Sequence, residues 1–160
     1  MANKKELTRE MKKVADRASA QAARLTATDW AKPVYQNGWN VKQMYSHMAS
    51  TGSIISRLIE RAKAPPAPAG QQAAVDVDAW NARHVALRQD RSTDEIVAEI
   101  KSTYTSGAAL IESTPDPVLA VKVYDPNSKG QVPLSERLMQ MLVRHNNTHL
   151  DEIDKAVGKK

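Results

Sequence analysis

The sequence has 160 residues, of which 41% are apolar and 26% are charged, as in a single globular domain, which excludes extensive disorder. Its net charge of +5 comes from Lys and Arg residues interspersed with Asp and Glu, which favours a solvated helix surface over a nucleic-acid site. No apolar run of about 18 residues and no signal-peptide core is present, so we expect one cytoplasmic domain over residues 1–160 with no membrane partner.

The first predicted helix starts near Leu7. Apolar or small residues recur every three or four positions, as on one face of a helix, at Leu7, Met11, Val14, Ala18, Ala22 and Leu25. A residue that precedes a proline is pushed out of the helical region, so this helix should end before Pro33. The second helix is expected from Val41 to about Lys63, because Asn40 is a good N-cap and the residues after it form an apolar arc.

A Pro-rich run at 64–70 should end the second helix as a stiff extended connection. The third helical region runs from about Asp78 to Ser113 and is expected to break at 90–93, where Ser92 and Glu95 have the spacing of a capping box. A long loop at 115–133 follows, in which residues 118–124 alternate as in a short strand.

The last helix is expected from Leu134 to about Val157. Its inward stripe contains His145 and His149 among apolar residues. Phe is absent and aromatic residues make up 4% of the chain, so Leu, Ile, Val, Met and Ala must build the core, which suits packed helices. The sequence therefore predicts an all-α fold, a four-helix bundle with a long loop before the last helix.

Histidine spacing indicates a metal site. His145 and His149 are four residues apart, so they lie on one helix face about one turn from each other. Hydrogen-bonded core histidines are the alternative reading of such a pair. His47 changes the balance, because it lies about 60° from Met44 on the wheel of the second helix and also faces inward.

Three imidazoles with an open coordination position are typical of a catalytic rather than a structural metal site. The chain has no cysteine, so thiolate ligands from the protein are excluded and any thiol must come from outside. Zinc, nickel, iron and copper all suit three imidazoles, so the sequence does not select among them. His84, beside Trp80 and Asn81, is expected on the surface or in a hydrogen bond rather than in the site.

Around these histidines the sequence resembles the DinB-like, or YfiT-like, family of metalloenzymes. The resemblance is carried by Gly38-Trp39-Asn40-Val41 followed by His47, by Trp80-Asn81, and by the C-terminal segment from Arg144 to Ile153 that contains both other histidines. It implies a DinB-type bundle in which His47, His145 and His149 bind zinc, nickel or a similar ion, often in a homodimer. Relatives that use bacillithiol, mycothiol or glutathione imply a low-molecular-weight thiol as a second cofactor.

Four further residues are candidates for the site. Glu152 shares the face of His145 and His149, where it could orient a ligand or act as a catalytic base, although a solvated carboxylate is the alternative. Trp39, Tyr45 and Trp80 are candidates for the wall of a substrate pocket, or else for core anchors.

Two functions remain open. In the first, the metal activates a thiol or water in a transferase, isomerase or hydrolase that acts on a small molecule. In the second, the chain is a non-catalytic metal- or ligand-binding dimeric bundle. Ile54 and Met139 widen the apolar surface of two helices beyond one seam, which is the kind of patch that a homodimer covers.

Overall fold

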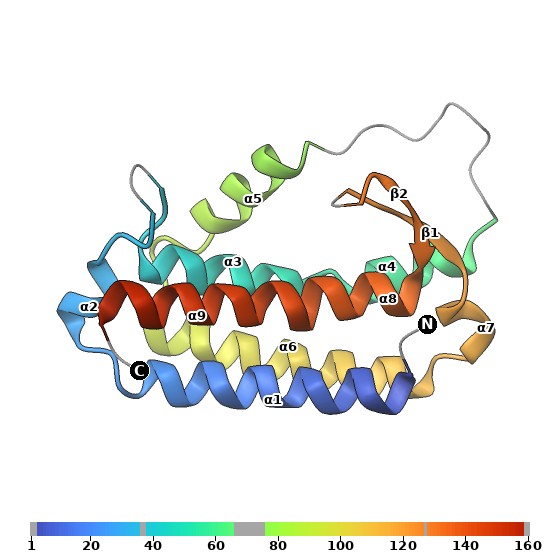
Figure 1. Cartoon of the computed structure of the whole chain (residues 1–160), viewed down its shortest axis with the longest axis horizontal. Coiled ribbons are helices and arrows are strands. Elements are labelled where there is room, and N and C mark those ends of the chain that lie inside the picture. Colours follow the sequence, from blue (N-terminus) through green and yellow to red (C-terminus); the bar gives the residue numbers. More distant parts are fainter. Residues whose placement is uncertain (1–2, 36–37, 66–75, 127, 159–160) are drawn as a thin grey trace.

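The computed structural model describes residues 3–35, 38–65, 76–126 and 128–158. Four helical rods lie side by side in a bundle (Figure 1). They are α1 (Lys4–Ala22), α3 with α4 (Val41–Ser53, Ile55–Lys63), α6 (Thr93–Ser113), and a last rod of α8 (Leu134–Leu138), the π-helix η1 (Met139–Arg144) and α9 (His145–Val157). The predicted four-helix bundle is confirmed. Most of the Pro-rich connection lies outside the described residues.

Shorter elements connect the rods. They are α2 (Ala27–Ala31), α5 (Val77–Ala86), α7 (Asp116–Leu119) and the strands β1 (Lys122–Asp125) and β2 (Gly130–Pro133). The strands form an antiparallel hairpin in which Val123 is paired with Val132. The long loop predicted before the last rod is therefore real, and it contains α7 and this hairpin. Helix α5 and the hairpin both lie above the face of the bundle formed by α3 and the last rod (Figure 1).

Two predicted helix starts are set by their caps. Asn40 accepts a hydrogen bond from the backbone of Gln43, whose side chain accepts from the backbone of Asn40, so a complete capping box fixes where α3 begins. Ser92 and Glu95 form the same arrangement at α6, as their spacing predicts. The N-terminus of α3 therefore has a defined position two turns before His47.

The structure subdivides three helices that the sequence presents as continuous. The first ends at Ala22, and α2 is a separate helix before Pro33. The second rod is interrupted at Ile54, which separates α3 from α4. The last rod contains η1, whose carbonyls bind amides five rather than four residues on and so widen the turn. Leu134 and Leu138 before this turn, and Leu150 and Ile153 after it, are all buried in the core.

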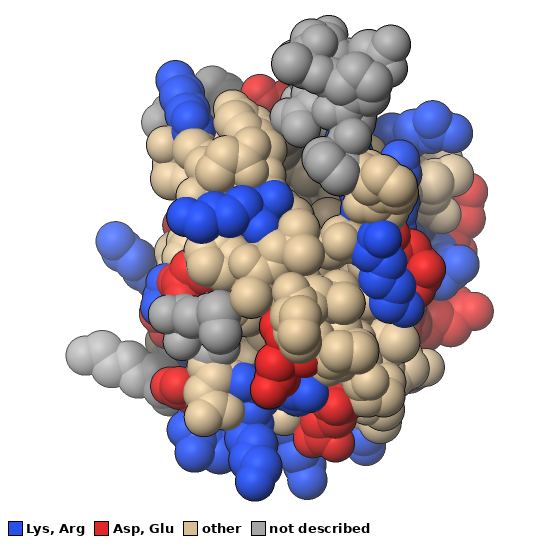
Figure 2. Space-filling model, turned by 90° about the vertical axis from the view of Figure 1, so that its right-hand side faces the viewer, with Lys and Arg blue, Asp and Glu red and all other residues tan. Residues whose placement is uncertain are grey.

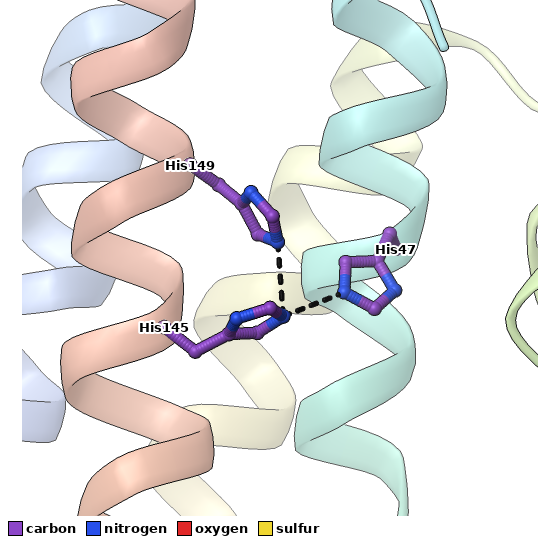
Figure 3. Close-up of side chains that lie close together, drawn as sticks. All are labelled: His47, His145 and His149. Carbon is purple, nitrogen blue, oxygen red and sulfur yellow. Dashed lines mark hydrogen bonds between the residues drawn. The ribbon is translucent and has the colours of Figure 1, made fainter. Parts of the chain in front are cut away.

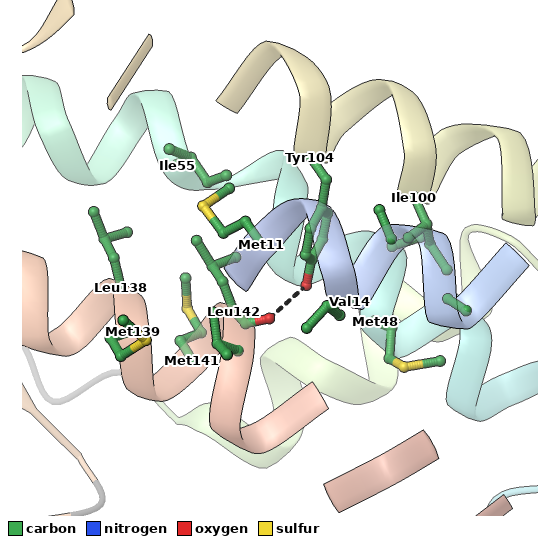
Figure 4. Close-up of a cluster of buried hydrophobic side chains, with 14 of the residues drawn as sticks. Met11, Val14, Met48, Ile55, Ile100, Tyr104, Leu138, Met139, Met141 and Leu142 are labelled. Carbon is green, nitrogen blue, oxygen red and sulfur yellow. Dashed lines mark hydrogen bonds between the residues drawn. The ribbon is translucent and has the colours of Figure 1, made fainter. Parts of the chain in front are cut away.

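The core is aliphatic and rich in methionine, as the composition indicates (Figure 4). In η1, Met139, Met141, Leu142 and Val143 are all buried, more than one α-helical stripe would bury. Ile54 is half-buried and packs against the same core. The apolar surplus predicted at Ile54 and Met139 is therefore used within this chain and does not form an exposed patch.

One end of the bundle has a surface of mixed charge. At the end of the bundle that carries α7 and the hairpin, basic and acidic side chains are interspersed around a neutral area (Figure 2). No basic stripe of the kind that binds nucleic acid appears on this face. Among the described residues, none of the helices has the length and apolarity needed to cross a membrane.

Candidate metal centre

The three predicted histidines meet between two rods. His47 extends from the middle of α3, and His145 and His149 extend from the first two turns of α9 (Figure 3). His47 and His149 are buried, with 4% and 8% of their surface exposed, and His145 is half-buried. In the part of the chain that the structure describes, one cluster of at least three His, Asp or Glu side chains could hold a metal ion, and it consists of these three histidines.

Their Nε2 atoms point at one another. The Nε2 of His145 lies 3.1 Å from that of His47 and 2.9 Å from that of His149. All three ligand atoms lie within 4.8 Å of one another. The imidazole faces are steeply inclined, at 88° between His47 and His145 and 70° between His145 and His149, so nitrogens rather than ring faces meet at the centre.

Two of the three histidines have lowered pKa values, which favour the neutral, metal-binding form of imidazole over the charged form. Burial, followed by the neighbouring imidazoles, lowers the pKa of His47 to about 3 and that of His145 to about 4. Both rings are therefore neutral near pH 7, which is the state in which imidazole binds a metal. The chain supplies this state by burying the rings between helices.

Hydrogen bonding among the histidines alone is incomplete. The Nδ1 of His149 faces the carboxylate of Glu152 at 2.9 Å, so in neutral His149 the proton lies on Nδ1 and the Nε2 carries a lone pair. The Nε2 of His145 has one proton at most, so it can donate to His47 or to His149 but not to both. At least one inward nitrogen is left without a donor, whereas a metal cation would accept all three lone pairs.

The spacing also fits one ion. Two imidazole nitrogens bound at about 2.1 Å lie about 3.0 Å apart when at right angles and about 3.4 Å apart at a tetrahedral angle. The observed 2.9 and 3.1 Å are in the range expected for ligands that share an ion. Two of the three nitrogen pairs therefore have the spacing of ligands that share one divalent transition metal.

The sequence matches a known protein family over most of its length. Residues 11–146 match the mycothiol maleylpyruvate isomerase N-terminal domain. The chain belongs to this family. Together with the bundle, this membership places the chain in the DinB-like superfamily that its histidines and tryptophans resemble. No curated protein matches it by sequence.

Solved structures share the fold of this family member at low identity. YfiT from Bacillus subtilis, described as a probable metal-dependent hydrolase with an unusual four-helix bundle topology, is 17% identical, with a TM-score of 0.77 over 98% of this chain and 89% of that one. An uncharacterised protein from Clostridium difficile 630 is 13% identical, with a TM-score of 0.75 over 97% of this chain and 95% of the other. These similarities establish the fold.

A third structural relative is larger. The mycothiol-dependent maleylpyruvate isomerase is 16% identical, with a TM-score of 0.72 over 95% of this chain, but the match covers 61% of the isomerase. This chain thus corresponds to one part of that enzyme. The remainder of the isomerase has no counterpart in this match.

Glu152 lies directly behind one of the histidines. Its carboxylate accepts hydrogen bonds from the Nδ1 of His149 and from the hydroxyl of Tyr35, which reaches it from the loop before α3. Burial raises the pKa of Glu152, but the bonds from Tyr35 and His149 outweigh this and hold it below the ordinary value. The ionised carboxylate is thus placed to fix the tautomer of His149, one of the two site roles considered from sequence.

The three aromatic candidates occupy different places. Trp39 lies against His47, with ring centroids 5.2 Å apart, and lines a cavity of about 190 Å³ between α3 and α5. Trp80 stacks on His84 at 3.9 Å, so His84 is held on α5 outside the trio. Tyr45 is fully buried, and its hydroxyl bonds to Ala18 and Gln21 of α1. Tyr45 thus takes the core position that the sequence left as its alternative.

Sequence reasoning did not select Tyr35 or Asn146. Tyr35 falls in a predicted loop, and no local pattern connects it to a residue more than a hundred positions away. Asn146 did leave a signal, because it is a polar residue midway between Leu142 and Leu150, at a position where the stripe calls for an apolar side chain. It is completely buried.

Proposed function

We propose that this chain is a metal-dependent enzyme in which His47, His145 and His149 hold one divalent transition metal, zinc, nickel or iron, and present it to a low-molecular-weight thiol or to water. The observation that carries the proposal is the convergence of one ligand nitrogen from each of three histidines, two buried and one half-buried, within 4.8 Å of one another. When bound, the metal lowers the pKa of a coordinated thiol or water and so supplies a nucleophile near neutral pH.

The protein's own contribution is to hold the ligands neutral and oriented. Burial between α3 and α9 keeps His47 and His145 unprotonated. Glu152 keeps the proton of His149 on Nδ1, which directs the Nε2 lone pair to the centre. Three protein ligands leave coordination positions for a substrate or cofactor, as in catalytic rather than structural sites.

Family membership supports a thiol as the second component. The matching domain is named for a mycothiol-dependent isomerase, and a structural relative of the chain is that enzyme. Since the chain has no cysteine, a thiol in the site must be an added molecule such as mycothiol, bacillithiol or glutathione. A cytoplasmic location, expected from the sequence, would place the site where such thiols are kept reduced.

Cobalt substitution tests this function. Protein loaded with Co²⁺ is expected to develop a thiolate-to-metal absorption band in the near ultraviolet when mycothiol or glutathione is added, because the thiol would ionise on the metal. The parallel assay is metal-dependent isomerisation of maleylpyruvate with mycothiol, and ester hydrolysis without it. If the metal-loaded protein shows neither a thiolate band nor turnover, the proposed enzymatic function is contradicted, and a non-catalytic binding module is favoured.

Glu152→Gln provides a sharper test of the site. Glutamine keeps the shape of the side chain but loses the carboxylate, so we expect metal affinity to fall by about 10-fold or more. Glu136→Gln on the same rod is the matched control, because Glu136 pairs with Arg144 at the surface. Competition with a chelating dye measures both, and equal affinities would remove Glu152 from the site.

We also propose a homodimer, in keeping with the family resemblance. The apolar surplus at Ile54 and Met139 does not support it, since these side chains pack within the chain. Light scattering at tens of micromolar protein is expected to give twice the chain mass of 17.6 kDa. A mass near 17.6 kDa would refute the dimer.

A further inference from the structure

A buried polar network lies one helical turn from the histidines. Its members are Thr51 on α3, Tyr104 on α6 and Asn146 on α9, with 4%, 1% and 0% of their surface exposed. Polar groups are costly to bury without partners, and within the described residues the Oδ1 of Asn146 is the one side-chain polar atom of the three that lacks a partner.

Each donor proton of the three side chains has a partner. The amide of Asn146 donates to the Oγ1 of Thr51 at 2.9 Å and to the hydroxyl of Tyr104. Thr51 in turn donates to the carbonyl of Met48 at 2.7 Å, and Tyr104 donates to the carbonyl of Leu142 at 3.1 Å (Figure 4). Burial raises the pKa of Tyr104 to about 12, so the hydroxyl remains a donor.

The network joins the two helices that carry the site. Thr51 is four residues after His47, one turn further along the same face of α3. Asn146 directly follows His145 in the chain. The bond between Thr51 and Asn146 therefore links α3 to α9 at the turn next to the three imidazoles.

Tyr104 extends the link to the π-helix. It accepts from Asn146 and donates to Leu142, a residue of η1 three positions before His145. The turn where η1 passes into α9 is thereby fixed from α6. Helix α6 also packs closely against α3 near this turn: a Cβ added to Gly52 of α3 would collide with Thr103 of α6.

We propose that Thr51, Tyr104 and Asn146 are positioning residues that set the separation and rotation of α3 and α9, and so bring the three Nε2 atoms to the spacing of metal ligands. The proposal rests on the proposed metal function. It assigns the π-helix a role as well, since the wide turn of η1 ends at His145 with its Leu142 carbonyl held by Tyr104. Wide turns of this kind are frequent at functional sites.

Tyr45 offers a matched control. It is also a fully buried tyrosine with a bonded hydroxyl, but that hydroxyl contacts Ala18 and Gln21 of α1 rather than the turns beside the histidines. Removing the oxygen from Tyr45 or Tyr104 leaves a similar defect in the core. Only the removal at Tyr104 should disturb the metal ligands.

The experiment compares Tyr104→Phe, Thr51→Val and Tyr45→Phe with the parent, using Co²⁺ and Zn²⁺ as probes. Competition with a chelating dye gives the affinity, the visible spectrum of bound Co²⁺ reports ligand geometry, and thermal melting of metal-free protein reports stability. We expect Tyr104→Phe and Thr51→Val to lose about 10-fold in affinity and to shift the Co²⁺ bands. Tyr45→Phe should lose comparable thermal stability while keeping the affinity and spectrum of the parent.

Parent-like affinity and spectrum in both Tyr104→Phe and Thr51→Val would overturn the positioning role while leaving the metal site intact. An equal loss in Tyr45→Phe would also overturn it, because the effect would then be one of general stability. A parent that binds neither ion would remove the metal function itself, which separates the failure of the two proposals. Thr51→Val keeps the test decisive if Tyr104→Phe does not fold.

Discussion

Protein purified without an affinity tag is expected to carry about one equivalent of transition metal per chain, and His145→Ala less than about a tenth of that. The Nε2 of His145 lies within 3.1 Å of both other ligand nitrogens, so its removal takes away the central member of the trio. Two remaining imidazoles bind a divalent ion far more weakly than three. Elemental analysis of both proteins, purified in parallel, measures the difference.

His84→Ala is the control for this measurement. His84 is a histidine of the same chain that stacks on Trp80 and does not belong to the trio. The His84→Ala variant is expected to retain the metal content of the parent. Equal metal content in the parent and in His145→Ala would rule out the site. A loss of metal in His84→Ala would show that removing a histidine outside the trio also lowers the metal content.

Metal is expected to raise the melting temperature of the metal-free protein by roughly 8 to 16 °C at a free concentration about 1,000 times the dissociation constant. Binding to the folded chain alone stabilises it by about 4 kcal/mol under that condition, and each kcal/mol shifts the midpoint of a domain of this size by about 2 to 4 °C. The shift should grow with the logarithm of metal concentration. Calorimetry of chelated protein titrated with Zn²⁺ or Ni²⁺ measures it.

The same titration of His145→Ala is expected to give a much smaller shift, because the variant lacks the ligand between His47 and His149. Addition of Mg²⁺ to the parent should have little effect, since that ion prefers oxygen ligands. If the chelated and the metal-loaded parent protein melt at the same temperature, this result contradicts a preformed metal site.

Helix positions followed from local chemistry. The capping boxes at Asn40 and Ser92 satisfy backbone amides within four residues, so sequence spacing was enough to place the starts of α3 and α6. His145 and His149 lie on one face for the same reason, because the helical repeat fixes neighbours four residues apart. These predictions needed no knowledge of the partners across the bundle.

The interruptions of the rods did not follow from such patterns. No Pro or Gly marks η1, and the apolar stripe from Leu134 to Ile153 is compatible with a continuous α-helix. The pair Gly52 and Ser53 does precede the interruption at Ile54, but the prediction of one continuous second helix made no use of it. The π-helix depends on what packs against it, including the hydroxyl of Tyr104 on the Leu142 carbonyl. The burial of Met139, and with it the loss of the expected apolar patch, was therefore decided by packing.

The sequence by itself determined the fold class and the inward direction of His47, His145 and His149, because these depend on helical periodicity and on residue spacing. Its motifs also resembled the superfamily in which the family match places the chain. Tertiary structure alone decided which atoms meet. The convergence of three Nε2 atoms, the bond from Tyr35 to Glu152, and the link from Thr51 through Asn146 to Tyr104 connect residues up to 117 positions apart. Such contacts are set by the separation and rotation of packed rods, which local periodicity leaves free.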